Sequence, residues 1–180
     1  MSSVRELTSG TCVAWPLPAD ASCAATARAL YRAAAAAVEL APGLADDGIT
    51  MASELAANTL HAGTPAANRS EFWLALDGRG PSRELVCQVF DASPEWSSGF
   101  APSLDPRPAP AEATGGRGLQ VVHELSGGRW GYHQCQARLG QPRSEGKAVW
   151  FALPAPPEAV ADQLYGLLLS TRGRGGQLAY

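Results

Sequence analysis

The most informative stretch of the chain reads Ser53-Glu54-Leu55-Ala56-Ala57-Asn58-Thr59-Leu60-His61-Ala62-Gly63. It is typical of the second half of a helix that begins near Asp46 and ends at Gly63. The residues that share the side expected to pack on a core are Leu44, Gly48, Met51, Leu55, Thr59 and Ala62. The stretch therefore predicts an amphipathic helix with one buried side.

A polar stripe runs beside that apolar side and consists of Asp47, Thr50, Glu54, Asn58 and His61. Glu54 and Asn58 are four residues apart, so they lie one above the other and point the same way. A carboxylate can take a proton from a nucleophile, and an amide oxygen suits a hydrated Mg²⁺. The pair can therefore line a catalytic cleft, although the same pattern also fits the solvated edge of an ordinary amphipathic helix.

The composition predicts one globular domain. The chain has 180 residues, of which 46% are hydrophobic and 17% charged, and its net charge is -3. Without a basic block, nucleic acid is not an expected partner. We expect no secretory signal, no membrane span and a cytoplasmic location. The cysteines are far apart in sequence (Cys12, Cys23, Cys87 and Cys135), which favours buried reduced thiols over a zinc site or disulfides.

The remaining elements alternate between helices and strands. We expect strands over residues 11–18, 71–77, 84–91, 129–138 and 147–153, with a hairpin turn at 78–81. The prolines in the first strand limit it to a sheet edge or end it early. Helices are expected from Asp20 or Ser22 to about Leu40, and over 156–169. We expect an arm over 1–10, one domain over 11–170 and a flexible tail over 171–180.

A glycine-rich turn precedes a short amphipathic run over 119–125. It reads Gly115-Gly116-Arg117-Gly118, followed by Leu119. Glycines let the backbone approach a ligand closely, and the free N–H groups at a helix start attract an anion. The turn is therefore a candidate phosphate site. Such turns also occur without function, and Arg117 could be an ordinary surface charge.

An aspartate stands at the end of a predicted buried strand, in Val89-Phe90-Asp91-Ala92-Ser93. A carboxylate there is costly unless something bonds to it, and a base with an exocyclic amino group would do so. An Asx-type turn would explain it equally well. The proline-rich stretch that follows, over 92–114, is longer than an ordinary loop and predicts a mobile lid.

Taken in order, these features resemble the GHKL-type ATP-binding domain of histidine kinases, gyrase and anti-sigma-factor switch kinases. Residues 54–63 resemble its N-box, 91–93 and 116–122 its two glycine boxes, and 146–150 its closing strand. The resemblance is greatest to the compact anti-sigma-factor serine kinases and the related ATP-binding regulators of actinobacteria. It implies a Bergerat-type α/β two-layer sandwich, with a mixed sheet of about five strands and helices on one face.

The resemblance also implies roles. Glu54 would be the general base, Asn58 would hold Mg²⁺, and Asp91 would accept the adenine amino group. The phosphates of ATP would lie against the glycine-rich turn, formed by Gly115, Gly116, Arg117, Gly118 and Leu119. The partner would be a sigma factor or an anti-anti-sigma-type protein, with no nucleic acid and no membrane, and a homodimer is compatible with the family.

Two departures from the family pattern affect nucleotide binding. Ser93 replaces a glycine-rich continuation after Asp91, and Ala148 stands where the family often has a threonine. The second change is expected to remove a polar contact to adenine. Three hypotheses follow: a serine/threonine protein kinase acting on a partner, a nucleotide-dependent binding protein without kinase activity, and a structural domain with a vestigial site. The intact Glu54/Asn58 pair favours the first over the second, whereas the altered glycine box and the unusual lid favour the second.

Overall fold

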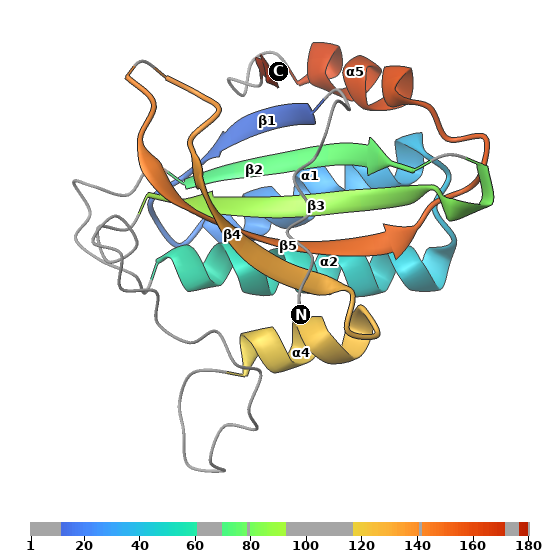
Figure 1. Ribbon diagram of the computed structural model, residues 1–180, viewed down its shortest axis with the longest axis horizontal. Helices are drawn as coiled ribbons and strands as arrows, with labels where there is room; N and C mark the ends of the chain where they lie inside the picture. Colours follow the sequence, from blue (N-terminus) through green and yellow to red (C-terminus); the bar gives the residue numbers. More distant parts are fainter. Residues whose placement is uncertain are drawn as a thin grey trace.

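A single antiparallel sheet forms one layer of the fold (Figure 1). The computed structural model describes residues 12–60, 70–78, 80–92, 117–140, 142–171 and 177–179. Within them the sheet has six strands in the order β4-β5-β3-β2-β1-β6. Their bounds are β1 Cys12–Leu17, β2 Ser70–Asp77, β3 Glu84–Asp91, β4 Trp130–Gln136, β5 Glu145–Pro154 and β6 Gln177–Ala179. Every strand pair among these residues is antiparallel, so the expectation of a mixed sheet is wrong.

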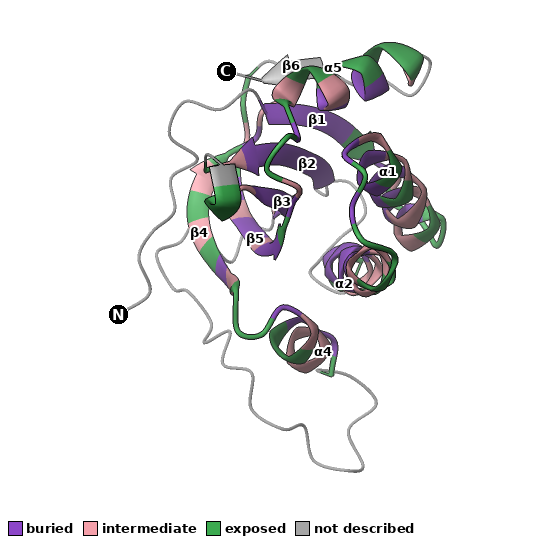
Figure 2. Cartoon of the chain, turned by 90° about the vertical axis from the view of Figure 1, so that its right-hand side faces the viewer, coloured by how far each residue is buried: buried purple, intermediate pink, exposed green. Residues whose placement is uncertain are grey.

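Helices form the second layer. Their bounds are α1 Cys23–Ala37, α2 Pro42–Thr59, α4 Gly118–Leu125 and α5 Ala161–Ser170. The buried residues of α1 and α2 face the sheet, and α4 lies beside α2 (Figure 2). This arrangement confirms the predicted two-layer α/β sandwich with helices on one face of the sheet. Among the described residues, no helix is long and apolar enough to cross a membrane.

The helix that carries Glu54 begins four residues earlier than predicted. Pro42 occupies its first turn, where proline has no N–H to lose and its fixed φ suits a helix. Four of the residues predicted to face the core are buried (Gly48, Met51, Leu55 and Thr59), and Leu44 is half-buried. The predicted end at Gly63, together with His61 and Ala62, lies outside the described residues.

The end of α1 has the geometry of a Schellman motif. The N–H of Leu40 donates to the carbonyl of Ala35 at 2.8 Å, and that of Glu39 to Ala36 at 3.2 Å. Glu39 adopts a φ of 55°, a left-handed conformation that glycine adopts more easily. The chain thus leaves the first helix without a glycine and turns directly into α2.

The middle of the sheet agrees with the sequence expectation, whereas the end formed by β1 and β6 differs from it. The predicted hairpin is present between β2 and β3, with the short 3-10 helix η1 (Gly80–Ser82) in its loop. Strand β1 was expected to lie at the edge or to end early. Cys12, Val13 and Ala14 pair with β6, so β1 is not the edge strand. Three residues of the segment predicted as a flexible tail therefore form a strand. Pro16 lies beyond β6 and pairs only with β2 in the observed register.

The last predicted helix also begins late, at Ala161 instead of Pro156. Proline disfavours helical geometry in the residue before it, and Pro156 precedes Pro157. The chain makes a turn there, in which the Ala159 N–H donates to the Pro156 carbonyl at 3.0 Å. Helix α5 then starts after Val160, whose N–H donates to the side chain of Gln163 at 2.8 Å.

Both faces of the sheet carry buried side chains. The helix-facing core includes the large residues Trp15, Tyr31, Phe72 and Phe151. On the opposite face a smaller cluster contains Cys12, Ala14, Trp73, Ala75, Phe90, Ala137 and Ala148. The buried carboxylate of Glu71 accepts bonds from the Trp73 indole at 2.8 Å and from the N–H of Arg138 at 2.8 Å. These bonds attach the segment after β4 to the sheet.

Candidate functional site

Helix α2 presents Glu54 and Asn58 on its outer side. Leu55 and Thr59, the residues that follow each of them, are buried and fix the rotation of the helix. Arg28 of α1 donates to the hydroxyl of Ser53 at 2.8 Å, which holds the two helices together next to Glu54. Glu54 is half-buried and Asn58 is exposed. The acid therefore stands at the rim of the core and the amide is exposed. This arrangement fits a stacked pair lining a surface site, and it also fits the solvated edge of an amphipathic helix.

The first residue of α4 packs against this pair. A Cβ at Gly118 would lie 2.9 Å from Oε2 of Glu54, and 3.4 and 3.5 Å from Nδ2 and Oδ1 of Asn58. A side chain at position 118 would displace the carboxylate of Glu54, so glycine lets the start of α4 approach both side chains where they stand. Val122, fully buried, anchors the helix from the next turn. Gly118 and Asn58 are 60 residues apart in sequence but adjoin in space.

The rest of the predicted phosphate site is described only in part. Arg117 precedes α4 and is exposed, while Leu119 is half-buried and packs against the core. Gly115 and Gly116 lie outside the described residues, as do 93–114 of the predicted lid, so the lid prediction is untested. The part of the turn that the structure describes places the start of a helix, with its free N–H groups, beside Glu54 and Asn58.

A small cavity lies between α2 and the ends of β3 and β5. Its volume is about 30 Å³, enough for about one water molecule. The lining residues are Leu55, Asn58, Thr59, Val89, Asp91, Lys147 and Val149. Asn58 lines the cavity and is also the residue that a Cβ on Gly118 would touch, so the cavity and the helix start share a boundary. The structure thus brings together Glu54, Asn58, Asp91 and Gly118.

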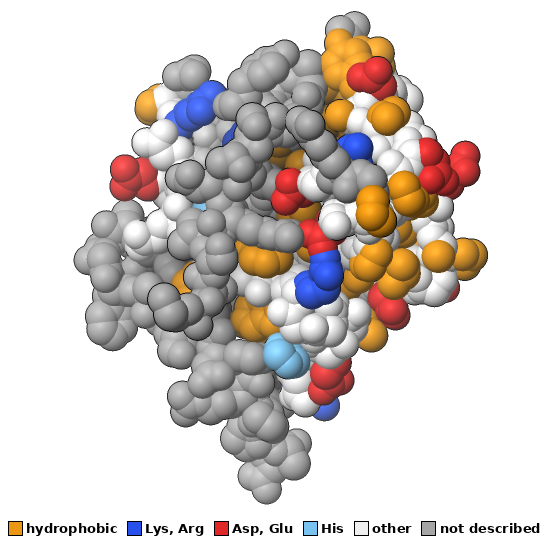
Figure 3. Space-filling view, turned by 45° about the vertical axis from the view of Figure 1, so that its right-hand side comes forward, with side chains coloured by type: hydrophobic (Ala, Val, Ile, Leu, Met, Phe, Trp, Pro, Cys, Tyr) orange, Lys and Arg blue, Asp and Glu red, His pale blue; other side chains and the backbone are white. Residues whose placement is uncertain are grey.

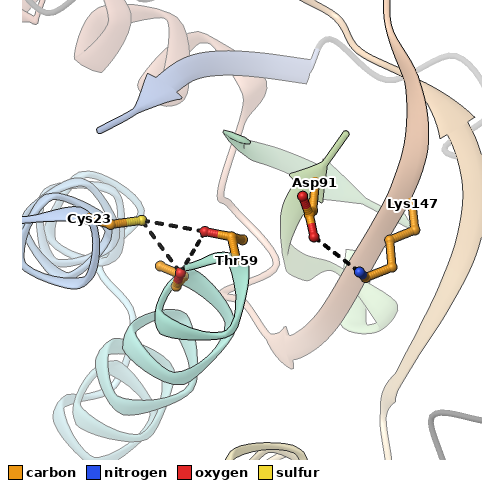
Figure 4. Close-up of polar contacts among 5 residues, drawn as sticks. Cys23, Thr59, Asp91 and Lys147 are labelled. Carbon is orange, nitrogen blue, oxygen red and sulfur yellow. Dashed lines mark hydrogen bonds and ion pairs between the residues drawn. The ribbon is translucent and has the colours of Figure 1, made fainter. Parts of the chain in front are cut away.

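Asp91 is the buried polar group of this cavity. Its side chain is 3% exposed, and its Oδ2 accepts from Nζ of Lys147 at 3.1 Å (Figure 4). Its Oδ1 is buried and has no hydrogen-bond partner among the residues that the structure describes. An unpartnered carboxylate oxygen inside a protein is costly, because it has lost water and gained no donor. This oxygen is therefore a position where a ligand's N–H donor would be strongly favoured.

Sequence reasoning missed Lys147 and the apolar walls Val89 and Val149. The signal was present in the alternation of the strands, because residues two apart lie on the same face. Val89 and Asp91 are such a pair on β3, and Lys147 and Val149 are another on β5. Their register, Val89 opposite Val149 and Asp91 opposite Lys147, closes the cavity. That register depends on long-range pairing, which sequence alone did not provide.

The expected effect of Ala148 has to be corrected. Its side chain is fully buried on the opposite face of the sheet, in the cluster with Trp73 and Phe90. A residue at 148 therefore points away from the cavity, so its identity does not remove a polar contact there. Gly146, two residues earlier, approaches Asp91 from that same strand. A Cβ on Gly146 would lie 2.2 Å from the carbonyl oxygen of Asp91, so this position admits only glycine without backbone movement.

Behind the cavity, the thiol of Cys23 belongs to a structural network (Figure 4). Cys23 Sγ donates to the carbonyl of Ala56 at 3.4 Å, and the Thr59 hydroxyl donates to the same carbonyl at 2.8 Å. Burial raises the pKa of Cys23, as well as that of Cys12 to about 11 and that of Cys135 to about 12. All four cysteines are free thiols; Cys12, Cys23 and Cys87 are buried as predicted, whereas Cys135 is half-buried. The described residues contain no cluster of metal-ligating His, Cys, Asp or Glu side chains.

The surface around the site carries mixed charges. On the face in Figure 3, the described basic side chains stand apart from one another, among acidic and apolar ones. His123, on α4, is exposed, and its Nδ1 accepts from the indole of Trp130 at 3.1 Å. This bond makes His123 part of a surface contact between α4 and β4.

Comparisons with known proteins found no matching family model and no significant match to a curated protein or a solved structure.

Proposed function

We propose that the chain is an ATP-binding regulatory protein that transfers the γ-phosphoryl group of ATP to a serine or threonine of a partner protein. The partner we propose is a sigma factor or an anti-anti-sigma-type protein, and the location we propose is the cytoplasm. The fold we propose is the Bergerat type. The observation that carries the proposal is the meeting of Gly118 with the Glu54/Asn58 pair, next to a cavity that contains an unpartnered oxygen of Asp91.

The base and the phosphates would occupy opposite ends of the site. The apolar side chains of Leu55, Val89 and Val149 suit the faces of a flat ring, and Oδ1 of Asp91 suits the adenine amino group. The N–H groups at the start of α4 suit phosphate oxygens, because a helix start carries partial positive charge. Asn58 lies between these two ends, since it lines the cavity and faces Gly118.

The donor set near Gly118 fits a hydrated Mg²⁺. This ion usually keeps several waters and takes one or two protein oxygens plus phosphates, so a single amide with a neighbouring carboxylate is sufficient. When bound, Mg²⁺ would neutralise charge on the β- and γ-phosphates. Asn58 would hold the ion through its side-chain oxygen.

Glu54 is the residue with the chemistry of a general base. Its Oε2 would take the proton of the acceptor hydroxyl. The oxygen of that hydroxyl would bond to the γ-phosphorus, while the bond between the γ-phosphorus and the leaving ADP oxygen breaks. Phosphoryl transfer depends mainly on positioning and charge neutralisation, so this small set of groups is enough in principle. Glu54 is half-buried, which leaves its carboxylate accessible to a partner's side chain.

A second function, nucleotide-dependent partner binding without phosphoryl transfer, is favoured by a specific observation. The volume of the cavity is only about 30 Å³ and Lys147 already pairs with Asp91, so adenine must widen the cavity to enter it. A site that changes shape on binding could signal nucleotide occupancy without any chemistry.

The variants Glu54→Ala and Asn58→Ala distinguish the two functions. A general base acts mainly in the transition state. Glu54→Ala should therefore leave the Kd for MgATP within a few-fold of wild type, and it should slow phosphoryl transfer about a hundred-fold or more. Asn58→Ala should weaken Mg²⁺-dependent nucleotide binding itself. The assay measures the transfer of radiolabelled phosphate from ATP to partner proteins that the chain captures. A pull-down of the same partner proteins by each variant measures partner binding. Equal labelling by wild type and Glu54→Ala would remove Glu54 from the mechanism, and no labelling by wild type would favour the second function.

A further inference from the structure

Lys147 is the only lysine of the chain. The sequence has 14 basic residues, and all the others are arginines. An ammonium group is compact and carries three N–H donors, whereas a guanidinium is a broad planar fork. The single lysine lines the cavity and pairs with its buried carboxylate, with a side chain that is 13% exposed.

The Lys147–Asp91 pair places a donor directly beside an acceptor. Nζ lies 3.1 Å from Oδ2 of Asp91, and the other oxygen of the same carboxylate, Oδ1, is the one without a partner. The two residues are also directly opposite each other on β3 and β5, so both side chains leave the same face of the sheet at the same level. The cavity therefore presents a positive donor and a negative acceptor side by side, between apolar walls.

The Watson–Crick edge of adenine has the complementary pattern. Its exocyclic amino group is a donor, and the adjacent ring nitrogen N1 is an acceptor. We propose that Lys147 donates a hydrogen bond to N1 of the bound adenine, while Oδ1 of Asp91 accepts from the amino group. Lys147 is thus a specificity-determining residue of the base site. This inference rests on the proposed ATP-binding function and adds a second base-reading group to it.

The same arrangement disfavours guanine in that position. Guanine has a carbonyl oxygen in place of the amino group and an N–H in place of the N1 acceptor. The carbonyl would face the carboxylate and the N–H would face the ammonium, so both pairs would repel. Adenine entry requires the cavity to widen, and Lys147 borders it with a long flexible stem that already reaches the solvent.

The test removes either partner of the proposed bond. Lys147→Met keeps a stem of similar bulk without the ammonium, and 1-deaza-ADP replaces N1 of adenine by C–H. The matched control is Glu145→Gln, which changes an exposed charge on the same strand. Calorimetry measures the Kd of ADP, 1-deaza-ADP and GDP, each with Mg²⁺, for the three proteins, and circular dichroism checks that each is folded.

Wild type and Glu145→Gln should bind 1-deaza-ADP about tenfold more weakly than ADP, the scale of one hydrogen bond to a charged group. Lys147→Met should bind the two alike, and GDP should bind wild type more weakly than ADP. An unchanged preference for ADP in Lys147→Met would overturn the assignment. Tighter ADP binding by Lys147→Met would also overturn it, because the ammonium would then be an obstacle that the base displaces. If folded wild type bound none of these nucleotides, the ATP-binding function itself would fail.

Acetylation gives a second test that needs no variant, because Lys147 is the only side-chain amine. With the ammonium bonded to adenine, MgADP should slow the acetylation of Lys147 by acetic anhydride, followed by mass spectrometry. Faster acetylation in MgADP would contradict the proposal, since the base would then have driven the lysine into solvent. This test also decides the matter if Lys147→Met does not fold.

Discussion

Replacing Gly118 by alanine tests whether the start of α4 and the Glu54/Asn58 pair form one site. The new Cβ would lie 2.9 Å from Oε2 of Glu54, and ordinary van der Waals contact needs roughly half an ångström more. The group in the way is the flexible end of a side chain, so the carboxylate can move aside without disturbing the backbone. We therefore expect a local displacement of Glu54 and Asn58, and an intact fold.

The expected magnitudes differ sharply between stability and function. Alanine is a better helix former than glycine, so the free energy of unfolding should be unchanged or higher by less than about 1 kcal/mol. A misplacement of a catalytic group by about 1 Å can lower the rate about a hundred-fold. A displacement of the Glu54 carboxylate by about half an ångström should therefore lower the rate of phosphoryl transfer about tenfold. The added methyl group should also weaken MgADP binding by a similar factor, because it stands beside the residue proposed to hold Mg²⁺.

The measurements are urea unfolding and calorimetry with MgADP, run on wild type and Gly118→Ala. The reasoning would be refuted by a variant that binds MgADP as tightly as wild type, because the space at Gly118 would then be irrelevant to the site. Loss of several kcal/mol in stability would refute it differently, by showing that Gly118 is needed for packing.

Three further predictions concern stability and use denaturant or thermal unfolding. Gly146→Ala should destabilise the protein by about 1–3 kcal/mol, because the new Cβ would lie 2.2 Å from the backbone oxygen of Asp91, which cannot move aside as a side chain can. A variant as stable as wild type would contradict this. Tyr31→Phe should be neutral or stabilising, since no described residue bonds to the buried hydroxyl. A decrease of more than about 1 kcal/mol in the free energy of unfolding would mean that the hydroxyl has a partner. Glu39→Gly should stabilise by about 1 kcal/mol, because the φ of 55° strains glutamate, whereas Glu39→Ala should not.

Local patterns in the sequence predicted much of the helix layer and the position of the candidate site. The buried side of α2 followed from the helical spacing of Met51 and Leu55, which contact the core as expected. The isolation of Asp91 at the end of an apolar strand indicated a buried carboxylate, and its side chain is indeed 3% exposed. These features depend on neighbours in sequence, so periodicity and residue chemistry are enough to find them.

Features that depend on long-range pairing could not be predicted in this way. The direction of the strands and the pairing of β6 with β1 are set by contacts between distant segments. The orientation of β5 decided that Lys147 enters the cavity and Ala148 faces the opposite side of the sheet. A shift of one residue in register would exchange the two. The alternation along β5 groups Lys147 with Val149, but it does not say which face of the strand meets the helices.

The central claim is that Asp91 reads adenine in a nucleotide site, and calorimetry of wild type and Asp91→Asn tests it most directly. Both proteins are titrated with MgADP and with Mg²⁺-pyrophosphate, which lacks a base. We predict that wild type binds MgADP, with a stabilisation of about 2.7 kcal/mol at a hundred-fold excess over the Kd. Asp91→Asn should bind MgADP at least tenfold more weakly and pyrophosphate equally well. No heat and no thermal shift for wild type in millimolar MgADP, or equal MgADP affinity in both proteins, would contradict the account.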